Sequence, residues 1–395
     1  MLSVQSAATV RATLPAVGAN LDAITERFYA GMFAARPELL RDLFNRGNQA
    51  AGTQRQALAG SIAAFATYLT DHPDDRPDAM LARIAHKHAS LGVAPDQYGI
   101  VHEHLFAAIV DVLGEAVTPE VAAAWDEVYW LMANALIALE KRLYEESREP
   151  GWRDWEVVER VAETADVVTF RLRPSDGGPV ADFRAGQYVS VRVELPDGAR
   201  QIRQYSLSGA PDSALRQISV KRVAEDAGSP AGEVSEHLHA RVQEGAVLEL
   251  SAPYGDLVLG ADTDRPLLLA SAGIGVTPMI AMLAQLAQDG SACPVTVLHG
   301  DRSPADHALR TDQELYAAKL AEARVHFWYE EDAPEDAHTG LVDLADIAVA
   351  PGTHAYLCGP LPFMRAVRTQ LIGKGVAPAD IHYEVFGPDL WLTQG

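Results

Sequence analysis

A turn containing two glycines follows an apolar run in the last third of the chain. The run is residues 267–270 (Leu-Leu-Leu-Ala), and the turn opens a helical stretch that contains Met279 and Gln288. Glycine lets a ligand approach the backbone closely, and a helix N-terminus favours the negative charge of a dinucleotide pyrophosphate. Because the spacing differs from the Rossmann G-x-G-x-x-G pattern, this turn alone does not establish a nucleotide site. Its residues are Gly273, Ile274, Gly275, Val276, Thr277 and Pro278.

His88 is a candidate ligand for a haem iron. It stands late in a helix-like run that ends before Gly92 and Pro95. A haem iron needs a neutral imidazole on one side, while the other side must be shielded and yet open to a diatomic gas. A lone histidine is more often a surface or core residue than a ligand, so its type and position alone do not decide the question.

Four residues that precede His88 in the sequence could shield the other side of such a haem. Gln54 and Leu58 are four residues apart, so they share one face of a predicted helix. Together with Tyr29 and Phe44 they would form an aromatic roof that holds two hydrogen-bonding groups. An ordinary helical core is the alternative interpretation of the same residues.

The elements that would position these residues change character near residue 150. Residues 1 to about 146 have apolar positions at helical spacing, and Thr118 followed by Pro119 predicts the start of a long terminal helix. Short β-rich runs follow, and from residue 266 apolar strands alternate with helical stretches, as in a parallel α/β domain. We therefore expect three domains, over residues 1–146, 152–262 and 263–395.

The composition is that of an ordinary globular protein. The chain has 395 residues, 48% of them hydrophobic and 22% charged, and this length predicts two or three domains. A formal net charge of −22 repels phosphate backbones and anionic lipid, so we expect neither nucleic acid nor stable membrane association. Two cysteines are too few for a cysteine-ligated cluster, and without a signal-like segment we expect a cytoplasmic location.

The helical part resembles the globin of bacterial flavohaemoglobins. The residues that carry this resemblance are Phe28, Tyr29, Pro37, Glu38, Leu39, Leu43, Phe44, Asn45, Asn48, Gln49, Gln54, Arg55, Lys87, His88, Gln97, Tyr98 and Glu140. The resemblance implies an all-α globin fold in which His88 is the proximal haem ligand. It also implies that Tyr29 and Gln54 face bound oxygen, that Leu58 narrows access and that Phe44 packs on the porphyrin.

By the same resemblance, Tyr98 and Glu140 support the proximal side. A carboxylate that accepts the hydrogen of the ligand's other ring nitrogen gives the imidazole anionic character, which favours oxygen chemistry over storage. Without the resemblance, we would interpret Glu140 as part of an exposed pair with Lys141 or Arg142. Lys87 could contact a haem propionate or the flavin, or it could lie on a solvated helix face.

The second part of the chain resembles ferredoxin-reductase-like proteins, which implies an antiparallel β-barrel that binds FAD. Residues 186–188 (Gly-Gln-Tyr) and 203–206 (Arg-Gln-Tyr-Ser) form the pattern. The resemblance implies that Arg203 neutralises the FAD pyrophosphate, that Tyr205 lies along the isoalloxazine and that Ser206 bonds near flavin N5. Residues 232–235 resemble the phosphate-binding turn of that family. The remaining cofactor-binding candidates here are Tyr188, Gln204, Gly232, Val234 and Ser235.

The glycine turn near residue 275 is accompanied by a second motif at the end of a later apolar strand, and the two together look like the nicotinamide site of such reductases. This motif is Cys358, Gly359 and Pro360. We place Cys358 near nicotinamide, although a buried core thiol is the commoner role of a free cysteine. Arg302 could accept an adenosine 2′-phosphate or lie in a solvated loop, so the choice between NADH and NADPH stays open.

A segment near the C-terminus completes the resemblance, which implies that Phe386 lies against the flavin. Several relatives have cysteine where Val385 stands. The cofactor-binding candidates of this segment are Val385, Phe386, Gly387 and Pro388.

The resemblance spans nearly the whole chain and implies a flavohaemoglobin with haem b, FAD and NADH or NADPH. Such a protein passes NAD(P)H electrons through FAD to haem iron and oxidises nitric oxide with oxygen to nitrate, which detoxifies nitric oxide. We expect O2 and NO as small-molecule substrates, and a monomer. Two alternatives are an oxygen carrier or sensor with a haem-maintaining reductase, and a flavin reductase of peroxides, ferric iron or quinones.

Overall fold

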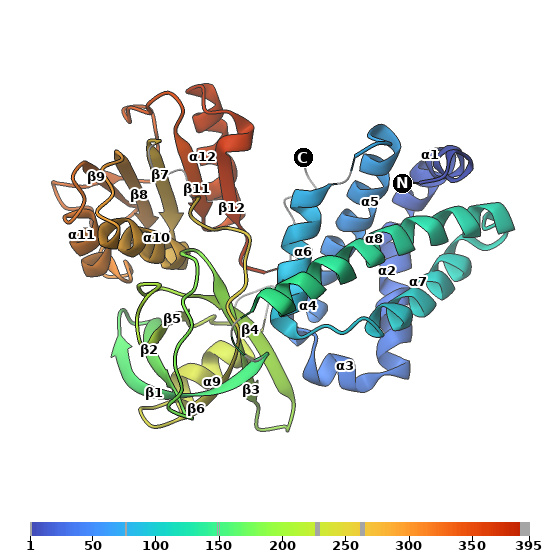
Figure 1. Cartoon of the computed structure of the whole chain (residues 1–395), viewed down its shortest axis with the longest axis horizontal. Helices are drawn as coiled ribbons and strands as arrows, with labels where there is room; N and C mark the ends of the chain where they lie inside the picture. The colour runs from blue at the N-terminus through green and yellow to red at the C-terminus, as the bar shows by residue number, and fades with distance from the viewer. Residues whose placement is uncertain are drawn as a thin grey trace.

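The computed structural model describes residues 2–75, 77–147, 149, 151–225, 230–260 and 265–387. The first part of the chain is helical, and two β-sheet parts follow it (Figure 1). The helices of the first part are α1 (Val4–Ala19), α2 (Leu21–Ala35), α3 (Pro37–Asp42), α4 (Arg46–Ala50), α5 (Thr53–Asp71), α6 (Asp78–Leu91), α7 (Gln97–Leu113), η1 (Gly114–Ala116) and α8 (Pro119–Glu146).

Local sequence features account for the ends of these helices. The hydroxyl of Thr118 accepts a 3.3 Å hydrogen bond from the Val121 amide, and Pro119 occupies the first turn of α8. Gly92 ends α6 with a φ of 76°, a conformation that glycine adopts without steric cost. The predicted long terminal helix is therefore confirmed. Among the described residues, no helix is long and apolar enough to cross a membrane.

The second part is an antiparallel sheet of order β4-β3-β6-β1-β2-β5. A bridge between Leu207 and Ile218 connects the ends of this order, so the sheet curls into a barrel. This is the architecture that the resemblance implied. Its elements are β1 (Trp152–Ala162), β2 (Val167–Pro174), β3 (Tyr188–Glu194), β4 (Arg200–Ser206), β5 (Arg216–Lys221), α9 (Glu233–Arg241) and β6 (Val247–Ser251).

The third part is a parallel sheet of order β10-β9-β8-β7-β11-β12. The chain moves outward from β7 to β10 and then returns to place β11 beside β7, so the switch point lies between β7 and β11. Its elements are β7 (Leu267–Ala272), η2 (Gly273–Gly275), α10 (Val276–Gln288), β8 (Val295–Asp301), α11 (Arg310–Ala317), β9 (Ala323–Tyr329), β10 (His338–Thr339), β11 (His354–Cys358), α12 (Leu361–Gly373), η3 (Pro378–Asp380) and β12 (Ile381–Glu384).

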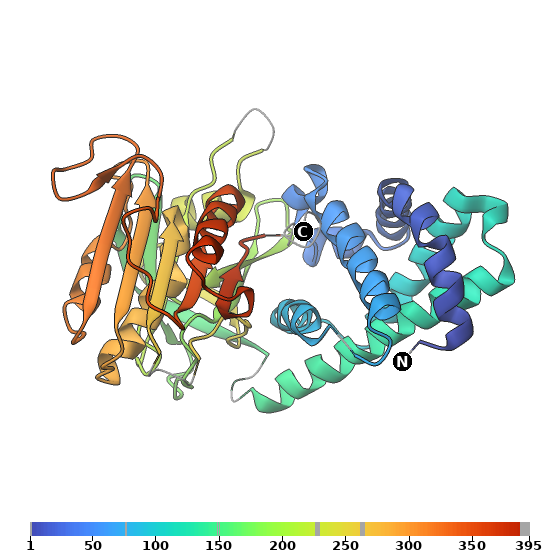
Figure 2. The same ribbon diagram turned by 90° about the horizontal axis from the view of Figure 1, so that it is seen from above.

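The three parts pack closely against one another. One hydrophobic core runs from Trp155 and Phe170 of the barrel to Met279 of helix α10 and Tyr356 of strand β11. On the helical side, α3 packs against β4 and α6 packs against β3. Figure 2 shows helices α1 to α8 on one side of the molecule and the two sheets, with their own helices, on the other. The predicted haem helix α6 therefore lies at the boundary with the barrel.

Candidate active site

Three helices bring the predicted proximal residues together. His88 lies near the end of α6, Tyr98 at the start of α7 and Glu140 late in α8. The Nδ1 atom of His88 is 2.8 Å from Oε1 of Glu140 and 2.9 Å from the hydroxyl of Tyr98. The Tyr98 hydroxyl donates a 2.5 Å hydrogen bond to the same carboxylate oxygen. All three side chains thus meet at one point.

The carboxylate of Glu140 is buried, with only 2% of the residue exposed. An exposed pair between Glu140 and Lys141 is therefore excluded, and Lys141 lies 3.8 Å from Glu145 instead. Burial, and then the hydrogen bond to Glu140, raise the pKa of Tyr98 well above its usual value. Tyr98 consequently stays protonated and donates to Glu140, while the carboxylate can accept the N–H of His88.

The predicted distal residues also gather in one place. Tyr29 is 5% exposed, and its ring meets that of Phe44 edge to face at a centroid distance of 5.9 Å. Burial raises the pKa of Tyr29 to about 12, against the opposing effect of hydrogen bonds with Gln54 and Gln49. Leu58 and Phe44 pack against the same helical core. Gln49 received no role in the sequence interpretation, since only the folded arrangement shows its contact with Tyr29.

Helix α6 contacts both sheet parts through side chains that precede His88 in the helix. Lys87 donates a 2.8 Å hydrogen bond from Nζ to the carbonyl oxygen of Gly387, so it does not lie on a solvated face. His86 accepts a 3.0 Å hydrogen bond at Nδ1 from the amide of Gly255. Arg83 lies 3.3 Å from Asp256 in an ion pair. No local pattern predicts the contacts of Arg83 and His86, because their partners are distant in the chain.

The predicted flavin residues line two neighbouring strands. Tyr188 of β3 is paired with Ser206 of β4, and Tyr205 packs on the barrel core. Burial lowers the pKa of Arg203 below its usual value. The guanidinium donates to the carbonyl oxygen of Ile202 at 2.7 Å, but no carboxylate of the described residues forms an ion pair with it. A half-buried cation without a paired carboxylate is suited to an anionic ligand.

The predicted phosphate-binding turn opens helix α9 beside strand β4. Gly232 precedes the helix, and within the described residues no side chain caps its N-terminus. Val234 and Ser235 are buried, and the Ser235 hydroxyl donates to the carbonyl of Gly232 at 2.9 Å. The backbone N–H groups of this turn can therefore receive a phosphate. With Arg203 on the adjacent strand, these groups fit the diphosphate of FAD.

The two predicted nicotinamide segments meet at the switch point of the parallel sheet. A Cβ atom at Gly275 would overlap the carbonyl oxygen of Cys358, so only glycine permits this approach. Burial raises the pKa of the Cys358 thiol well above its usual value, which keeps it protonated and argues against a nucleophilic role. Helix α10 begins directly after the glycine turn without a side-chain cap. The crevice of a nucleotide domain is expected at this position.

The other predicted cofactor-binding residues lie in the barrel and in the parallel-sheet part. Gln204 donates to the hydroxyl of Ser190 at 3.0 Å. Val385 packs on the core of the parallel sheet, whereas Phe386 is 47% exposed. Arg302 is held by Asp306, with 2.5 Å between Nη2 and Oδ1. Gly359 lies at the end of β11 with Pro360 at the start of α12, and Pro388 lies outside the described residues.

The geometry around His88 fits a haem. Because Nδ1 faces Glu140 and Tyr98, the imidazole has Nε2 left as its possible ligand atom, and no described residue hydrogen-bonds that atom. A metal-bound histidine characteristically donates its other ring N–H to a carboxylate. The residues of both sites therefore have the chemistry that haem and FAD need.

Three family models match the chain in succession. They are the globin model over residues 26–136, the oxidoreductase FAD-binding domain over 154–259 and the oxidoreductase NAD-binding domain over 269–369. Flavohemoproteins are similar over the full length: that of Bordetella parapertussis is 44% identical over 98% of this chain and 99% of its own. That of Bacillus subtilis is 37% identical over all of both chains.

Solved structures agree with these matches. A flavohemoglobin of Malassezia yamatoensis, with bound FAD and haem, superposes with a TM-score of 0.91 at 38% identity, over 98% of this chain and 100% of that one. The FAD/NAD-binding domain of a nitric oxide dioxygenase from Vibrio cholerae matches 60% of this chain and 100% of its own, with a TM-score of 0.57 at 39% identity.

Proposed function

This chain belongs to the flavohemoprotein family, and from that premise we propose that it is a nitric oxide dioxygenase. It would use NADH or NADPH electrons, passed through FAD to haem b, to oxidise NO with O2 to nitrate. We propose residues 1–146, 152–262 and 263–395 as its haem, FAD and NAD(P) domains, acting together as a monomer. Family membership supports an oxidoreductase, and the dioxygenase activity is the finer statement that needs a test.

One observation favours oxygen chemistry over oxygen storage. The buried carboxylate of Glu140 lies 2.8 Å from Nδ1 of His88. A negative charge at this position strengthens the imidazole as an electron donor to iron, which helps to activate bound oxygen. A carrier has no need of this arrangement, since it must release oxygen unchanged.

When bound, the three cofactors supply hydride transfer, conversion of electron pairs into single electrons, and activation of oxygen. The chain's own residues orient and protect them. Tyr98 holds the Glu140 carboxylate in place, while Glu140 holds the N–H of His88. On the distal side, Tyr29 remains protonated because its pKa is about 12, and it can donate a hydrogen bond to a ligand together with Gln54.

Other side chains would hold the reductase cofactors in place. Arg203 would neutralise the diphosphate of FAD, and the turn before α9 would offer backbone N–H groups to the same charge. The close approach of Gly275 to the backbone of Cys358 leaves no room for a side chain, and nicotinamide would bind beside it at the switch point of the sheet. Phe386 has an exposed ring that can lie against the flavin.

Steady-state rates with different electron acceptors test this proposal. Purified protein carrying haem and FAD would be supplied with NADH or NADPH and with NO plus O2, hydrogen peroxide, a ferric chelate or a quinone. We expect the fastest turnover with NO plus O2, and nitrate as the product. Faster reduction of peroxide, ferric iron or quinone would make the protein a general flavin reductase, and oxygen release without nitrate would make it a carrier or sensor.

A further inference from the structure

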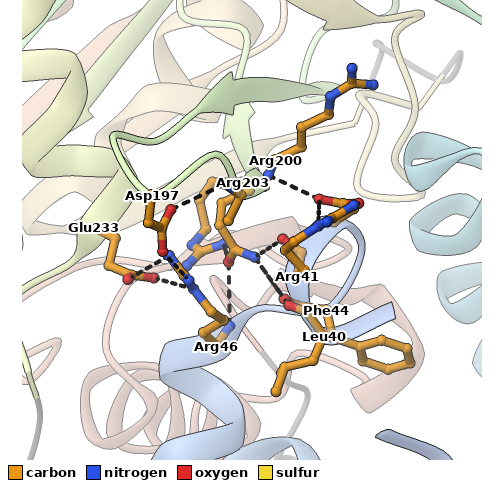
Figure 3. Close-up of polar contacts among 11 residues, drawn as sticks. Leu40, Arg41, Phe44, Arg46, Asp197, Arg200, Arg203 and Glu233 are labelled. Carbon is orange, nitrogen blue, oxygen red and sulfur yellow. Dashed lines mark hydrogen bonds and ion pairs between the residues drawn. The ribbon is translucent and has the colours of Figure 1, made fainter. Parts of the chain in front are cut away.

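Arg46 reaches from the helical part into the barrel. It is the first residue of α4, and its Nη1 atom lies 2.6 Å from the carboxylate of Asp197. Its Nε and Nη2 atoms donate to both oxygens of Glu233, at 3.2 and 2.8 Å. Figure 3 shows this guanidinium between the two carboxylates. Glu233 is the first residue of α9, in the turn that we propose for the FAD diphosphate.

Gln201 joins the same region to the haem side. The side chain is fully buried, and its Nε2 atom donates to the carbonyl oxygens of Arg41 at 2.9 Å and Phe44 at 3.2 Å. Its Oε1 atom accepts from Nη1 of Arg203 at 3.3 Å and from the backbone amide of Arg46 at 3.4 Å. The amide group of Gln201 therefore contacts both the segment that bears Phe44 and the cation that we assign to FAD.

The negative charges of Asp197 and Glu233 explain how Arg46 affects the binding of an anion nearby. Asp197 and Glu233 place two carboxylates beside the diphosphate turn, and each would repel the phosphates of FAD. Arg46 neutralises them from the globin side, and its bidentate contact fixes the side chain of Glu233. The Arg46 side chain is 27% exposed, so salt will weaken but not abolish this effect.

We propose that the globin domain completes the FAD site, with Arg46 as a positioning residue for the diphosphate turn. Gln201 connects the backbone of Arg46 to the guanidinium of Arg203, because its Oε1 atom accepts hydrogen bonds from both. FAD binding and docking of the globin domain then stabilise each other, because a coupling free energy acts equally in both directions. The inference rests on the proposed placement of FAD at Arg203 and the turn that opens α9.

The test is FAD affinity in the full-length chain, measured by flavin fluorescence as flavin-depleted protein is titrated with FAD. We expect Arg46→Ala to raise the dissociation constant about tenfold at low salt, with a smaller effect at high salt. A triple variant that also carries Asp197→Asn and Glu233→Gln should recover most of the affinity, since it no longer has the unpaired carboxylates. Arg27→Ala is a matched control, because Arg27 forms an exposed globin pair with Asp111.

Recovery in the triple variant separates electrostatic positioning from simple docking. This variant lacks the interdomain ion pairs, so a role limited to docking would leave its FAD affinity as low as that of Arg46→Ala. Unchanged affinity in Arg46→Ala would also overturn the inference. Arg203→Ala tests the underlying placement of FAD: if it binds FAD as tightly as the unaltered chain, the placement itself is wrong. If only Arg203→Ala weakens binding, the placement stands and the role of Arg46 does not.

Discussion

The hydroxyl of Ser190 donates a 3.0 Å hydrogen bond to the hydroxyl of Ser90, across the boundary between the barrel and the helical part. Both serines are fully buried. Ser190 in turn accepts from Gln204 at 3.0 Å, and Ser90 donates to the carbonyl oxygen of Lys87 at 2.8 Å. A buried chain of hydrogen bonds thus links the flavin motif to the helix that carries His88. This link is one of the contacts that hold the helix of His88 against the strand of the flavin motif.

Replacing Ser90 with alanine should disturb this boundary. The variant leaves the buried Ser190 hydroxyl without its acceptor, a loss that costs about 1–3 kcal/mol. We expect slower haem reduction after flavin reduction, with the hydride step unchanged, in anaerobic stopped-flow spectroscopy with NADH. Ser61→Ala is a suitable control, because the one hydrogen bond of the Ser61 hydroxyl among the described residues lies within its own helix, to the carbonyl oxygen of Ala57 at 2.9 Å. Equal haem reduction rates in both variants would show that the serine link has no role in electron transfer.

Replacing His88 should abolish the haem-dependent activity of the protein and leave its reductase activity. With His88→Ala we expect haem binding and nitrate production to disappear, because no other described side chain is placed to donate a ring N–H to the Glu140 carboxylate and still offer a second imidazole nitrogen to iron. Reduction of an artificial dye by NADH should persist, since it needs only the two sheet domains. Absorption spectra and dye reduction measure the two outcomes. Full haem content with normal nitrate yield would show that His88 is not the ligand.

Glu140→Gln probes the proximal carboxylate without changing its size. Removing the negative charge should lower NO turnover about 10–100-fold, the usual cost of losing a residue that orients a metal ligand. Resonance Raman spectra of the ferrous protein should show a weaker iron–histidine bond. Glu145→Gln lies on the same helix in an exposed pair with Lys141 and should leave both properties unchanged. Normal turnover with a normal iron–histidine frequency in Glu140→Gln would remove the argument for electron donation.

His307 should make the NAD(P) domain less stable in acid. Burial, and then the neighbouring His299, lower its pKa to about 2. In the unfolded chain the pKa of this histidine is near 6.5. Below pH 6.5 the unfolded chain therefore binds a proton that the folded protein does not, and the free energy of unfolding falls as the pH falls. Between pH 7.5 and pH 5.5 the loss is about 1.4 kcal/mol.

His307→Phe keeps the ring against His299 but cannot titrate. Thermal unfolding followed at several pH values should show a lower Tm than the unaltered chain at neutral pH, because the hydrogen bonds to Tyr329 and Gln313 are lost. Its Tm should nevertheless depend less on pH. A pH dependence as steep as that of the unaltered chain would assign the acid sensitivity to other groups.

Local patterns were sufficient to predict several elements. Thr118 and Pro119 mark the start of α8, and Gly92 marks the end of α6, because caps act through adjacent residues. The apolar run and glycines around Gly275 predicted a strand, a turn and a helix in the right order. The burial of Glu140 could not be predicted from local pattern, because a charged residue beside Lys141 is typical of a solvent-exposed helix face. Only the family resemblance indicated its burial.

The contacts between domains could not be predicted from the sequence. Gln201 and Arg46 are 155 residues apart, and Arg46 and Glu233 are 187 apart. No periodicity relates such positions, because their neighbours are decided by how complete domains pack. The same is true of the hydrogen bond between Ser90 and Ser190. The roles of these residues therefore emerge only from the folded chain.

A single-turnover experiment tests the central proposal most directly. Purified protein with haem and FAD would be reduced by NADH without oxygen, then mixed with O2 and NO while the visible spectrum is followed and nitrate is quantified. We predict haem reduction through bound FAD and one nitrate for each NO consumed. Flavin reduction without haem reduction, or NO loss without nitrate, would contradict the assignment as a nitric oxide dioxygenase.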